Sequence, residues 1–253
     1  MTTGALIFAI NNNEINYEAL AQWSACNIER HLGIPTHIVT ERDLARPAQS
    51  RWFPDYGRHM FWYNESRVDA YRVSPWERTL VLDADYVVAS DQLSVLLDLD
   101  QDFVAHRWAH DVTGISSFED HNYFGAVRMP QWWATVMMFR RSRAAELIFD
   151  SMIMIREHWN HYRQIYHNHK NTYRNDHALS MALGIVNGHV LDHAAIPWSL
   201  ATLMPQHQLT CQDQDSYRVD FVNQDRRYWL QLRGQDFHAM GKQQLGVIVG
   251  NHS

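Results

Sequence analysis

The chain has 253 residues, of which 46% are hydrophobic and 20% charged, and its formal net charge is −6. This composition is typical of a globular protein, and the acidic balance excludes a generally basic nucleic-acid-binding surface while leaving room for a local basic patch. Two cysteines exclude a disulfide framework and favour a reducing compartment. No apolar run reaches the roughly 18 residues that span a bilayer, and Ala5–Ile10 follows no basic signal-peptide segment, so we expect a cytoplasmic protein without a membrane partner.

The first 40 residues predict a βαβ unit. The apolar run Gly4–Ile10 is predicted to be a buried strand, and Thr36–Thr40 a second strand. Between them, Ile15 to Leu32 shows helical spacing of apolar residues, with Asn13 as the expected N-cap and Gly33 as the expected end. A βαβ unit requires parallel strands joined by a right-handed crossover. This start therefore predicts a parallel sheet.

Residues Glu41 to Tyr63 show little periodicity and predict a long loop. The loop carries three aromatic side chains, Trp52, Phe53 and Tyr56. Long loops in compact domains are often binding loops or lids, and the alternative is a packed surface loop. A short helix is predicted next, at Glu65–Val73, and it carries Arg67.

The strand predicted at Thr79–Leu82 runs into two acids that are one residue apart, Asp83 and Asp85. A buried carboxylate without a partner is energetically costly. A hard divalent cation such as Mg²⁺ or Mn²⁺ would compensate both acids and would bridge to substrate phosphates. The alternative is a polar strand end with two solvated acids. The pair therefore predicts a metal–diphosphate site, provided that other residues of the chain complete it.

Further extended segments or strands are predicted at Tyr86–Val88, Phe103–Trp108, Trp133–Phe139 and Tyr217–Val222, and the last of these is predicted to be an edge strand. Further helices are predicted at Asp91–Leu99, at Ala144–Trp159 and from Asn175 to Gly184. Asn160–Thr172 is expected to be solvated. The histidines in and beside it match no strong zinc spacing: His158, His161, His167 and His169. We predict one α/β domain over residues 1–253, with a mostly parallel sheet flanked by helices.

In this order of features the chain resembles the GT-A nucleotide-sugar glycosyltransferases, and among them the glycogenin-like and bacterial galactosyltransferase-like enzymes. The resemblance runs from Gly4 to Lys242, and its strongest elements are Leu82-Asp83-Ala84-Asp85 and His238-x-x-Gly241-Lys242. It implies the Rossmann-like GT-A fold. Residues from 1 to about 108 would then bind the nucleotide sugar, and those from about 109 to 253 would bind the acceptor and complete the metal shell.

The resemblance also implies roles for individual residues. Asp83 would lie near the ribose and the metal, Asp85 would ligate Mn²⁺ or Mg²⁺ directly, and His238 would be the third ligand. Lys242 would neutralise a phosphate oxygen. In the family two residues usually separate the glycine from this lysine, whereas Lys242 directly follows Gly241.

The resemblance also implies which residues bind the donor and which residue acts in catalysis. The end of the first strand, with Ala9, Asn11 and Asn12, would lie beside the uracil and ribose. Arg67 would clamp the diphosphate, the alternative being a surface ion pair. Asp176 would be the catalytic carboxylate that faces the sugar or the acceptor, the alternative being an acid that stabilises a helix N-terminus.

These features, with the resemblance, predict a metal-dependent hexosyl- or pentosyltransferase that moves a sugar from a nucleoside-diphosphate sugar, expected to be UDP-linked, to a hydroxyl group. The acceptor stays open between protein, glycan, small molecule and a modified base in phage DNA, the last in a host cytoplasm. DNA contacts would fall on Arg140-Arg141-Arg143 and Arg226-Arg227. A non-catalytic GT-A-like scaffold and an NDP-sugar nucleotidyltransferase are the alternatives.

Overall fold

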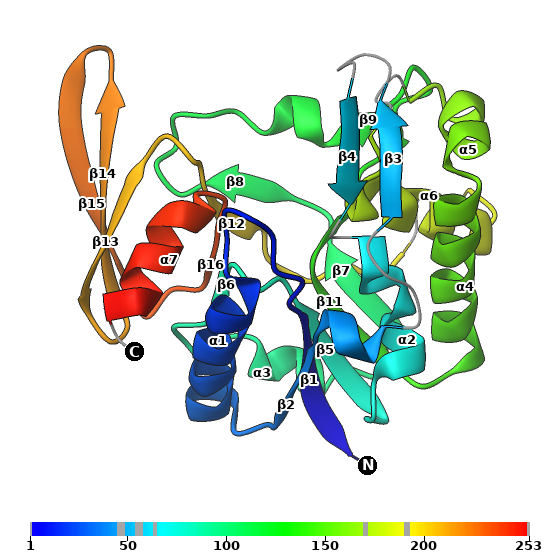
Figure 1. Cartoon of the computed structure of the whole chain (residues 1–253), viewed down its shortest axis with the longest axis horizontal. Coiled ribbons are helices and arrows are strands. Elements are labelled where there is room, and N and C mark those ends of the chain that lie inside the picture. Colours follow the sequence, from blue (N-terminus) through cyan, green and yellow to red (C-terminus); the bar gives the residue numbers. More distant parts are fainter. Residues whose placement is uncertain are drawn as a thin grey trace.

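The computed structural model describes residues 2–44, 49–53, 58–62, 65–168, 172–189 and 193–251. Its centre is a five-stranded sheet (Figure 1), in the order β2 (Thr36–Val39), β1 (Thr3–Phe8), β5 (Arg78–Leu82), β11 (Trp133–Arg140) and β7 (Phe103–His106). β1 is parallel to β2 and β5, whereas β11 is antiparallel to both of its neighbours. Four of the five strands therefore run in one direction, which confirms the predicted α/β class with a mostly parallel sheet.

Both faces of this sheet are buried, which explains why β5 is apolar along most of its length. Leu80 and Leu82 pack into a core with α1 (Tyr17–Leu32), and Val81 packs on the opposite face with α4 (Arg143–Glu157) and α6 (Asn175–Val186). Figure 1 shows α1 on one side of the sheet and α4 and α6 on the other. Alternating side chains of one strand thus serve two cores, as expected for a covered parallel sheet.

α1 begins later than predicted. Its N-cap is Asn16, whose Oδ1 accepts a hydrogen bond from the backbone N–H of Ala19 at 3.0 Å, so the assignment of Asn13 was wrong. The preceding residues form a turn instead, because Asn12 Oδ1 accepts the N–H groups of residues 14 and 15. The helix ends at Gly33, whose φ of 64° confirms the predicted glycine cap.

α6 does not end at Gly184 but continues to Val186. The glycine has a packing role there, since a Cβ atom at this position would lie 2.4 Å from the methyl carbon of Met129. A glycine that allows a close approach looks the same in the sequence as one that ends a helix.

A second sheet brings the end of the chain to the end of β5. Its strand order is β6 (Tyr86–Val87), β16 (Phe237–Ala239), β12 (Leu200–Leu203) and β8 (Ala109–Asp111). β16 is antiparallel to β6, and His238 pairs with Tyr86. α7 (Lys242–Asn251) follows β16 and packs against α1. Residues that are about 150 positions apart are thereby adjacent.

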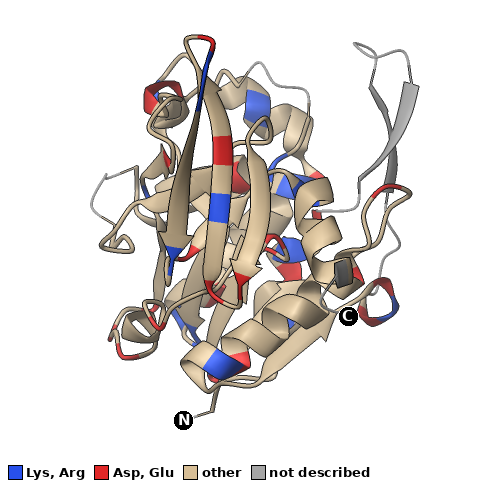
Figure 2. Cartoon of the chain, turned by 90° about the vertical axis from the view of Figure 1, so that its left-hand side faces the viewer, with Lys and Arg blue, Asp and Glu red and all other residues tan. Residues whose placement is uncertain are grey.

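A third, antiparallel sheet lies beside α7 at the left of Figure 1 and consists of β13 (Gln208–Asp213), β14 (Ser216–Asn223) and β15 (Arg226–Arg233). The segment predicted as an edge strand forms most of β14, which is the central strand, so that prediction was wrong. The neighbouring β15 is mostly exposed, with only Leu232 buried, and it was therefore not predicted as a strand. Figure 2 shows this sheet face-on, with acidic and basic residues interspersed on it.

Two segments that were predicted to be irregular contain regular structure. The loop region contains the hairpin of β3 (Gln49–Phe53) and β4 (Arg58–Trp62), and α5 (Trp159–Ile165) lies in the segment expected to be solvated, anchored by its buried first residue. The side chains of Trp52 and Phe53, and Tyr56 altogether, lie outside the described residues, as does His169.

The short elements are η1 (Glu41–Asp43), η3 (Glu65–Asp69), α2 (Ala70–Val73), α3 (Ser94–Leu97), η4 (Glu119–His121), β9 (Tyr123–Phe124) and β10 (Met129–Pro130). Within the described part of the chain, no helix combines the length and apolarity needed to cross a membrane.

Candidate functional site

Asp83 and Asp85 lie in the turn that joins β5 to β6. The N–H of Asp83 donates to the carbonyl oxygen of Thr135 in β11 at 3.0 Å, and the carbonyl oxygen of Asp85 accepts from the N–H of Ala239 in β16 at 2.9 Å. The backbone of this turn is therefore tied to both sheets. The two acids lie at the carboxyl end of a parallel strand, which is the edge where open α/β sheets bind ligands.

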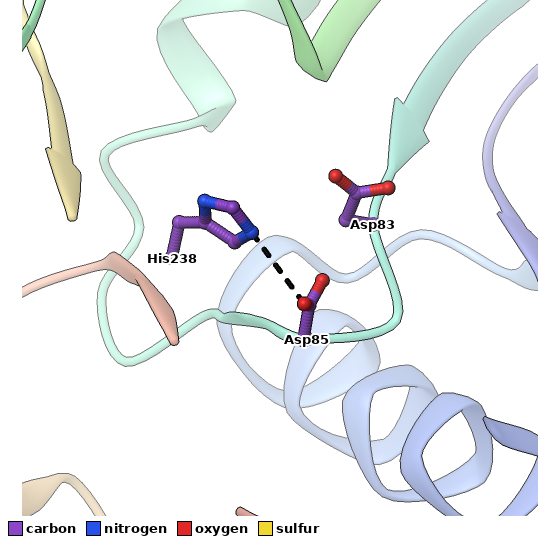
Figure 3. A group of neighbouring side chains, drawn as sticks. All are labelled: Asp83, Asp85 and His238. Atoms are coloured by element: carbon purple, nitrogen blue, oxygen red, sulfur yellow. Dashed lines mark ion pairs between the residues drawn. The ribbon is translucent and has the colours of Figure 1, made fainter. Parts of the chain in front are cut away.

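Asp83, Asp85 and His238 form a cluster whose potential ligand atoms all lie within 4.8 Å of one another. Figure 3 shows the three side chains turned toward a common space. His238 Nε2 lies 3.5 Å from Asp85 Oδ2, and Asp85 is only 2% exposed. Among the described residues, no other group of three or more His, Cys, Asp or Glu side chains could hold a metal ion. The described histidines of the segment around α5 therefore form no such site.

The cluster fits a divalent cation by its chemistry. Two carboxylates suit Mn²⁺ and Mg²⁺, and the imidazole adds a nitrogen donor that is typical of transition-metal ions. His238 Nδ1 is buried and makes no hydrogen bond within the part of the chain that the structure describes, and the buried Asp85 Oδ2 has charged contacts only with His238 and Lys242 there. Buried polar atoms without hydrogen bonds are uncommon in folded proteins and often mark a ligand or ion site.

Each of the two acids also faces a basic side chain. Arg67 Nη2 forms an ion pair with Asp83 Oδ1, and its Nη1 donates to the carbonyl oxygen of Ala134 at 2.9 Å. Lys242 Nζ lies 3.2 Å from Asp85 Oδ2. Burial alone would raise the pKa of Asp85, but the positive charge of Lys242 and the nearby His238 outweigh burial and hold the pKa well below its usual value. In return, Asp85 raises the pKa of Lys242. Both groups are therefore charged at neutral pH.

Asp176 lies in the first turn of α6 and is buried. Its Oδ1 accepts a hydrogen bond from the N–H of Ala134 at 2.9 Å, and its Oδ2 lies 3.2 Å from Arg174 Nη2. Burial opposes ionisation, but Arg174 and the Ala134 N–H outweigh it, so the pKa of Asp176 is lowered. The carboxylate is therefore ionised and held by both the helix start and β11.

These groups line one cleft of about 430 Å³. It contains seven of the nine predicted site residues: Asn12, Arg67, Asp83, Asp85, Asp176, His238 and Lys242. Ala9 and Asn11 are not among the residues that line it. Ala9 is fully buried and donates its N–H to the Val39 carbonyl oxygen at 2.8 Å, and Asn11 Oδ1 accepts the N–H of Glu18 in the first turn of α1 at 3.0 Å.

Several lining residues were not singled out in the sequence, among them Tyr17, Trp133, Thr135 and Arg174. Trp133 and Thr135 stand at the start of β11, and this strand runs antiparallel to β5. Its start therefore lies at the edge where β5 ends. Nothing in the local pattern of β11 indicated its direction, although Tyr17 could have been found from its position at the start of the first helix.

A second group of side chains includes the two residues that follow the end of β7 and is called the aromatic–arginine ladder below: Trp108, Arg107, Tyr123 and Arg128. Arg107 Cζ lies 4.2 Å from the ring centre of Trp108 and 5.2 Å from that of Tyr123, and Arg128 Cζ lies 4.7 Å from the Tyr123 ring centre. The ladder starts one residue after His106, which pairs with the cleft residue Trp133. Arg107 Nη1 also donates a hydrogen bond to the carbonyl oxygen of Gln131 at 3.1 Å, and among the described residues neither guanidinium pairs with an acid.

The arginine segments that were singled out in the sequence lie elsewhere. Arg140 pairs with Arg78 at the start of β5, roughly 16 Å along the strand from Asp83. Arg140, Arg141 and Arg143 all contact protein partners. Arg226 and Arg227 are exposed at the start of β15, beside the hairpin that joins it to β14.

Comparison with known proteins gave similar folds only among solved structures. The glycosyltransferase GlyE of Streptococcus pneumoniae TIGR4 is 16% identical with a TM-score of 0.45, over 78% of this chain and 46% of its own. The galactosyltransferase LgtC, in complex with donor and acceptor sugar analogues, is 14% identical with a TM-score of 0.45, over 71% of this chain and 70% of its own. Mouse xyloside xylosyltransferase 1 is 12% identical with a TM-score of 0.43, over 75% and 84%.

This chain thus spans less than half of the length of the GlyE structure. No protein-family model and no curated protein matches it. A function for this chain must therefore be inferred from the residues of its own site.

Proposed function

We propose that this chain is a metal-dependent glycosyltransferase that moves a sugar from a UDP-linked donor to a hydroxyl group of an acceptor. The observation that carries the proposal is the cluster of Asp83, Asp85 and His238, which shares one cleft with Asp176 at the carboxyl edge of the sheet. The cleft volume is within the usual range of small-molecule sites. A donor set of this kind suits a cation that also binds phosphate oxygens.

The residues of the cleft supply what departure of a diphosphate requires. Negative charge builds on the leaving phosphate oxygen, and a divalent cation held by Asp83, Asp85 and His238 would stabilise that charge. Arg67 and Lys242 add positive charge at the same place. Asp176 is ionised and lines the same cleft, so it is able to accept a hydrogen bond or a proton from a sugar or acceptor hydroxyl.

The two alternatives predict different behaviour. A scaffold that merely retains the acids would show no metal-dependent nucleotide binding. A nucleotidyltransferase would need a glycine-rich, basic loop after the first strand, whereas Asn11-Asn12-Asn13 stands there. The sequence after the first strand therefore argues against a nucleotidyltransferase, and nucleotide binding with and without metal separates a transferase from a scaffold.

The aromatic–arginine ladder favours an acceptor that carries negative charge and a flat face. Guanidinium groups stacked on aromatic rings remain available to anions, and exposed rings stack on bases or sugars. A modified base in DNA and an anionic glycan both have this chemistry, whereas an uncharged small molecule does not. Mass spectrometry of candidate acceptors incubated with enzyme and donor would identify the glycosylated product.

A thermal-shift series with UDP, GDP, CDP and TDP, each with and without Mn²⁺, tests the proposal. We expect UDP to raise the Tm only when Mn²⁺ is present, and Asp85→Asn to abolish that shift. Asp100→Asn is the matched control, because its side chain is 95% exposed at the opposite edge of the sheet. A wild-type protein whose Tm responds to none of the nucleotides would favour the scaffold.

A further inference from the structure

Lys242 places a compact positive charge on the carboxylate that is expected to ligate the metal. Its Nζ lies 3.2 Å from Asp85 Oδ2 and 5.5 Å from the ring centre of Tyr17. Of the 22 basic residues in the chain only Lys170 and Lys242 are lysines. A lysine carries a small, mobile point charge, whereas arginine presents a rigid planar fork. The basic group beside Asp85 is therefore a compact ammonium group, which resembles a metal cation more closely than a guanidinium group does.

We propose that Lys242 occupies the place of the divalent cation on Asp85 while the donor is absent, so that the cation and the nucleotide sugar bind strongly only together. This inference rests on the proposed function. It concerns the order and interdependence of binding, and it assigns Lys242 a role before the donor arrives as well as after.

The geometry makes the two cations compete for one carboxylate. A divalent cation binds a carboxylate oxygen at roughly 2.1 Å. The ammonium group of Lys242 already lies 3.2 Å from Oδ2 of this carboxylate, and two positive charges at such distances repel each other strongly inside a protein. Lys242 therefore has to turn away from Asp85 when a metal ion binds there.

Lys242 is better able to move than the other basic residue of the cluster. Its side chain is 34% exposed and has a flexible four-carbon stem. The Arg67 side chain is 6% exposed, and its guanidinium is held by both Asp83 and the carbonyl oxygen of Ala134. Lys242 is consequently the basic side chain of the cluster that can change its position. Once it has moved away from Asp85, its ammonium group is available to bind a phosphate oxygen.

Charge balance explains why metal and donor would depend on each other. Asp83 and Asp85 are already neutralised by Arg67 and Lys242. A divalent cation alone would leave two uncompensated positive charges in a largely buried site, which is unfavourable. A nucleoside-diphosphate sugar carries one negative charge on each of its two phosphates. The site is therefore neutral with both ligands or with neither.

The test measures Mn²⁺ binding to the full chain, by the EPR signal of free Mn²⁺, with and without UDP. For the wild type we expect UDP to tighten Mn²⁺ binding roughly ten-fold or more. For Lys242→Met we expect Mn²⁺ alone to bind roughly ten-fold more tightly than to the wild type, and the tightening by UDP to shrink. Lys242→Arg keeps the positive charge, so Mn²⁺ alone should bind to it no more tightly than to the wild type.

Lys242→Gln is a second uncharged variant in case Lys242→Met folds poorly, and urea unfolding without metal checks both. Equal affinity of the wild type and both uncharged variants for Mn²⁺ alone, with UDP-enhanced binding retained, would overturn the role of Lys242 and leave the proposed function standing. Absence of Mn²⁺ binding to every protein, with and without UDP, would overturn the proposed function and this inference together.

Discussion

The two edges of the five-stranded sheet hold charged side chains in different ways. Where β5 begins, basic side chains at the end of β11 and the start of α4 are partly exposed: Arg140 contacts Asp100 and Asp102, Arg141 the carbonyl oxygens of residues 74 and 76, and Arg143 Glu146. Where β5 ends, the acids are largely buried, and each is paired with a basic side chain: Asp83 with Arg67, Asp85 with Lys242 and Asp176 with Arg174.

The difference indicates which edge has a function. Exposed ion pairs contribute little to stability and cost little to keep. Buried charges carry a desolvation penalty that their pairing seldom overcomes by much, so their presence needs another reason. Buried groups with shifted pKa values in a cleft are typical of functional sites. The carboxyl edge meets this description, and the opposite edge does not.

Removing one negative charge at each edge should give the largest contrast. Asp85→Asn keeps the shape of the side chain but weakens the ligand, so we expect loss of Mn²⁺-dependent UDP binding and a fall in transfer rate of roughly 10²- to 10³-fold or more. Asp100→Asn should leave both unchanged. Initial rates of donor hydrolysis and of transfer provide the measurement, and wild-type turnover by Asp85→Asn would contradict the site assignment.

Removing one positive charge at each edge should separate the edges by stability. Arg67→Met leaves the carboxylate of Asp83 in the cleft without its cation and the carbonyl oxygen of Ala134 without its donor, so we expect a loss of about 3–5 kcal/mol in the free energy of unfolding. Arg140→Met should cost less than about 1 kcal/mol, because its partners are solvated. Urea unfolding measures both.

Mn²⁺ provides a further check on Arg67→Met. Added cation should recover part of the lost stability in this variant and none in Arg140→Met, because only the first loses a charge beside the cluster. Two results would contradict this prediction: a similar loss of unfolding free energy in both variants, or no recovery with Mn²⁺ in either. Each would mean that the ion pair at the carboxyl edge is no more important for stability than the one at the opposite edge.

The sequence was informative where a pattern is local. The central sheet could be predicted because its strands are apolar on both faces, and the acids were conspicuous because they end such a strand. His238 was found by resemblance alone, since β16 has only three residues and its partner strand is about 150 positions away. The direction of β11, and with it the place of Trp133, depends on long-range pairing. The exposed strand β15 carries no buried periodicity, so the central position of β14 could not be predicted.

A pH dependence should distinguish His106 from the acids at the same edge. His106 is fully buried at the end of β7, and burial lowers its pKa to about 4. Between pH 6.5 and pH 4 the unfolded chain therefore binds a proton that the folded chain does not, so stability falls as the pH falls through this window. The pKa values of Asp85 and Asp176 are lowered, so their stabilising contribution is lost only below the unfolded value of 3.8.

We expect His106 to account for about 2–3 kcal/mol of the loss between pH 7 and pH 4. Urea unfolding of the wild type and of His106→Gln at both pH values isolates this contribution, because all other titrating groups are common to the two proteins. The same loss in the variant as in the wild type would show that His106 titrates normally.

The smallest expected effect concerns the acceptor and compares one arginine from each edge. Arg107→Ala removes a guanidinium that lies against the rings of Trp108 and Tyr123 after the end of β7, so we expect the KM for an anionic acceptor to rise roughly 5- to 10-fold, with the KM for the donor unchanged. The salt dependence of the acceptor KM should become shallower as well. Arg143→Ala is the matched control, because its side chain is 71% exposed at the opposite edge. If the two variants behave alike, the acceptor does not contact the ladder, and the two edges differ only in how one of them holds the donor.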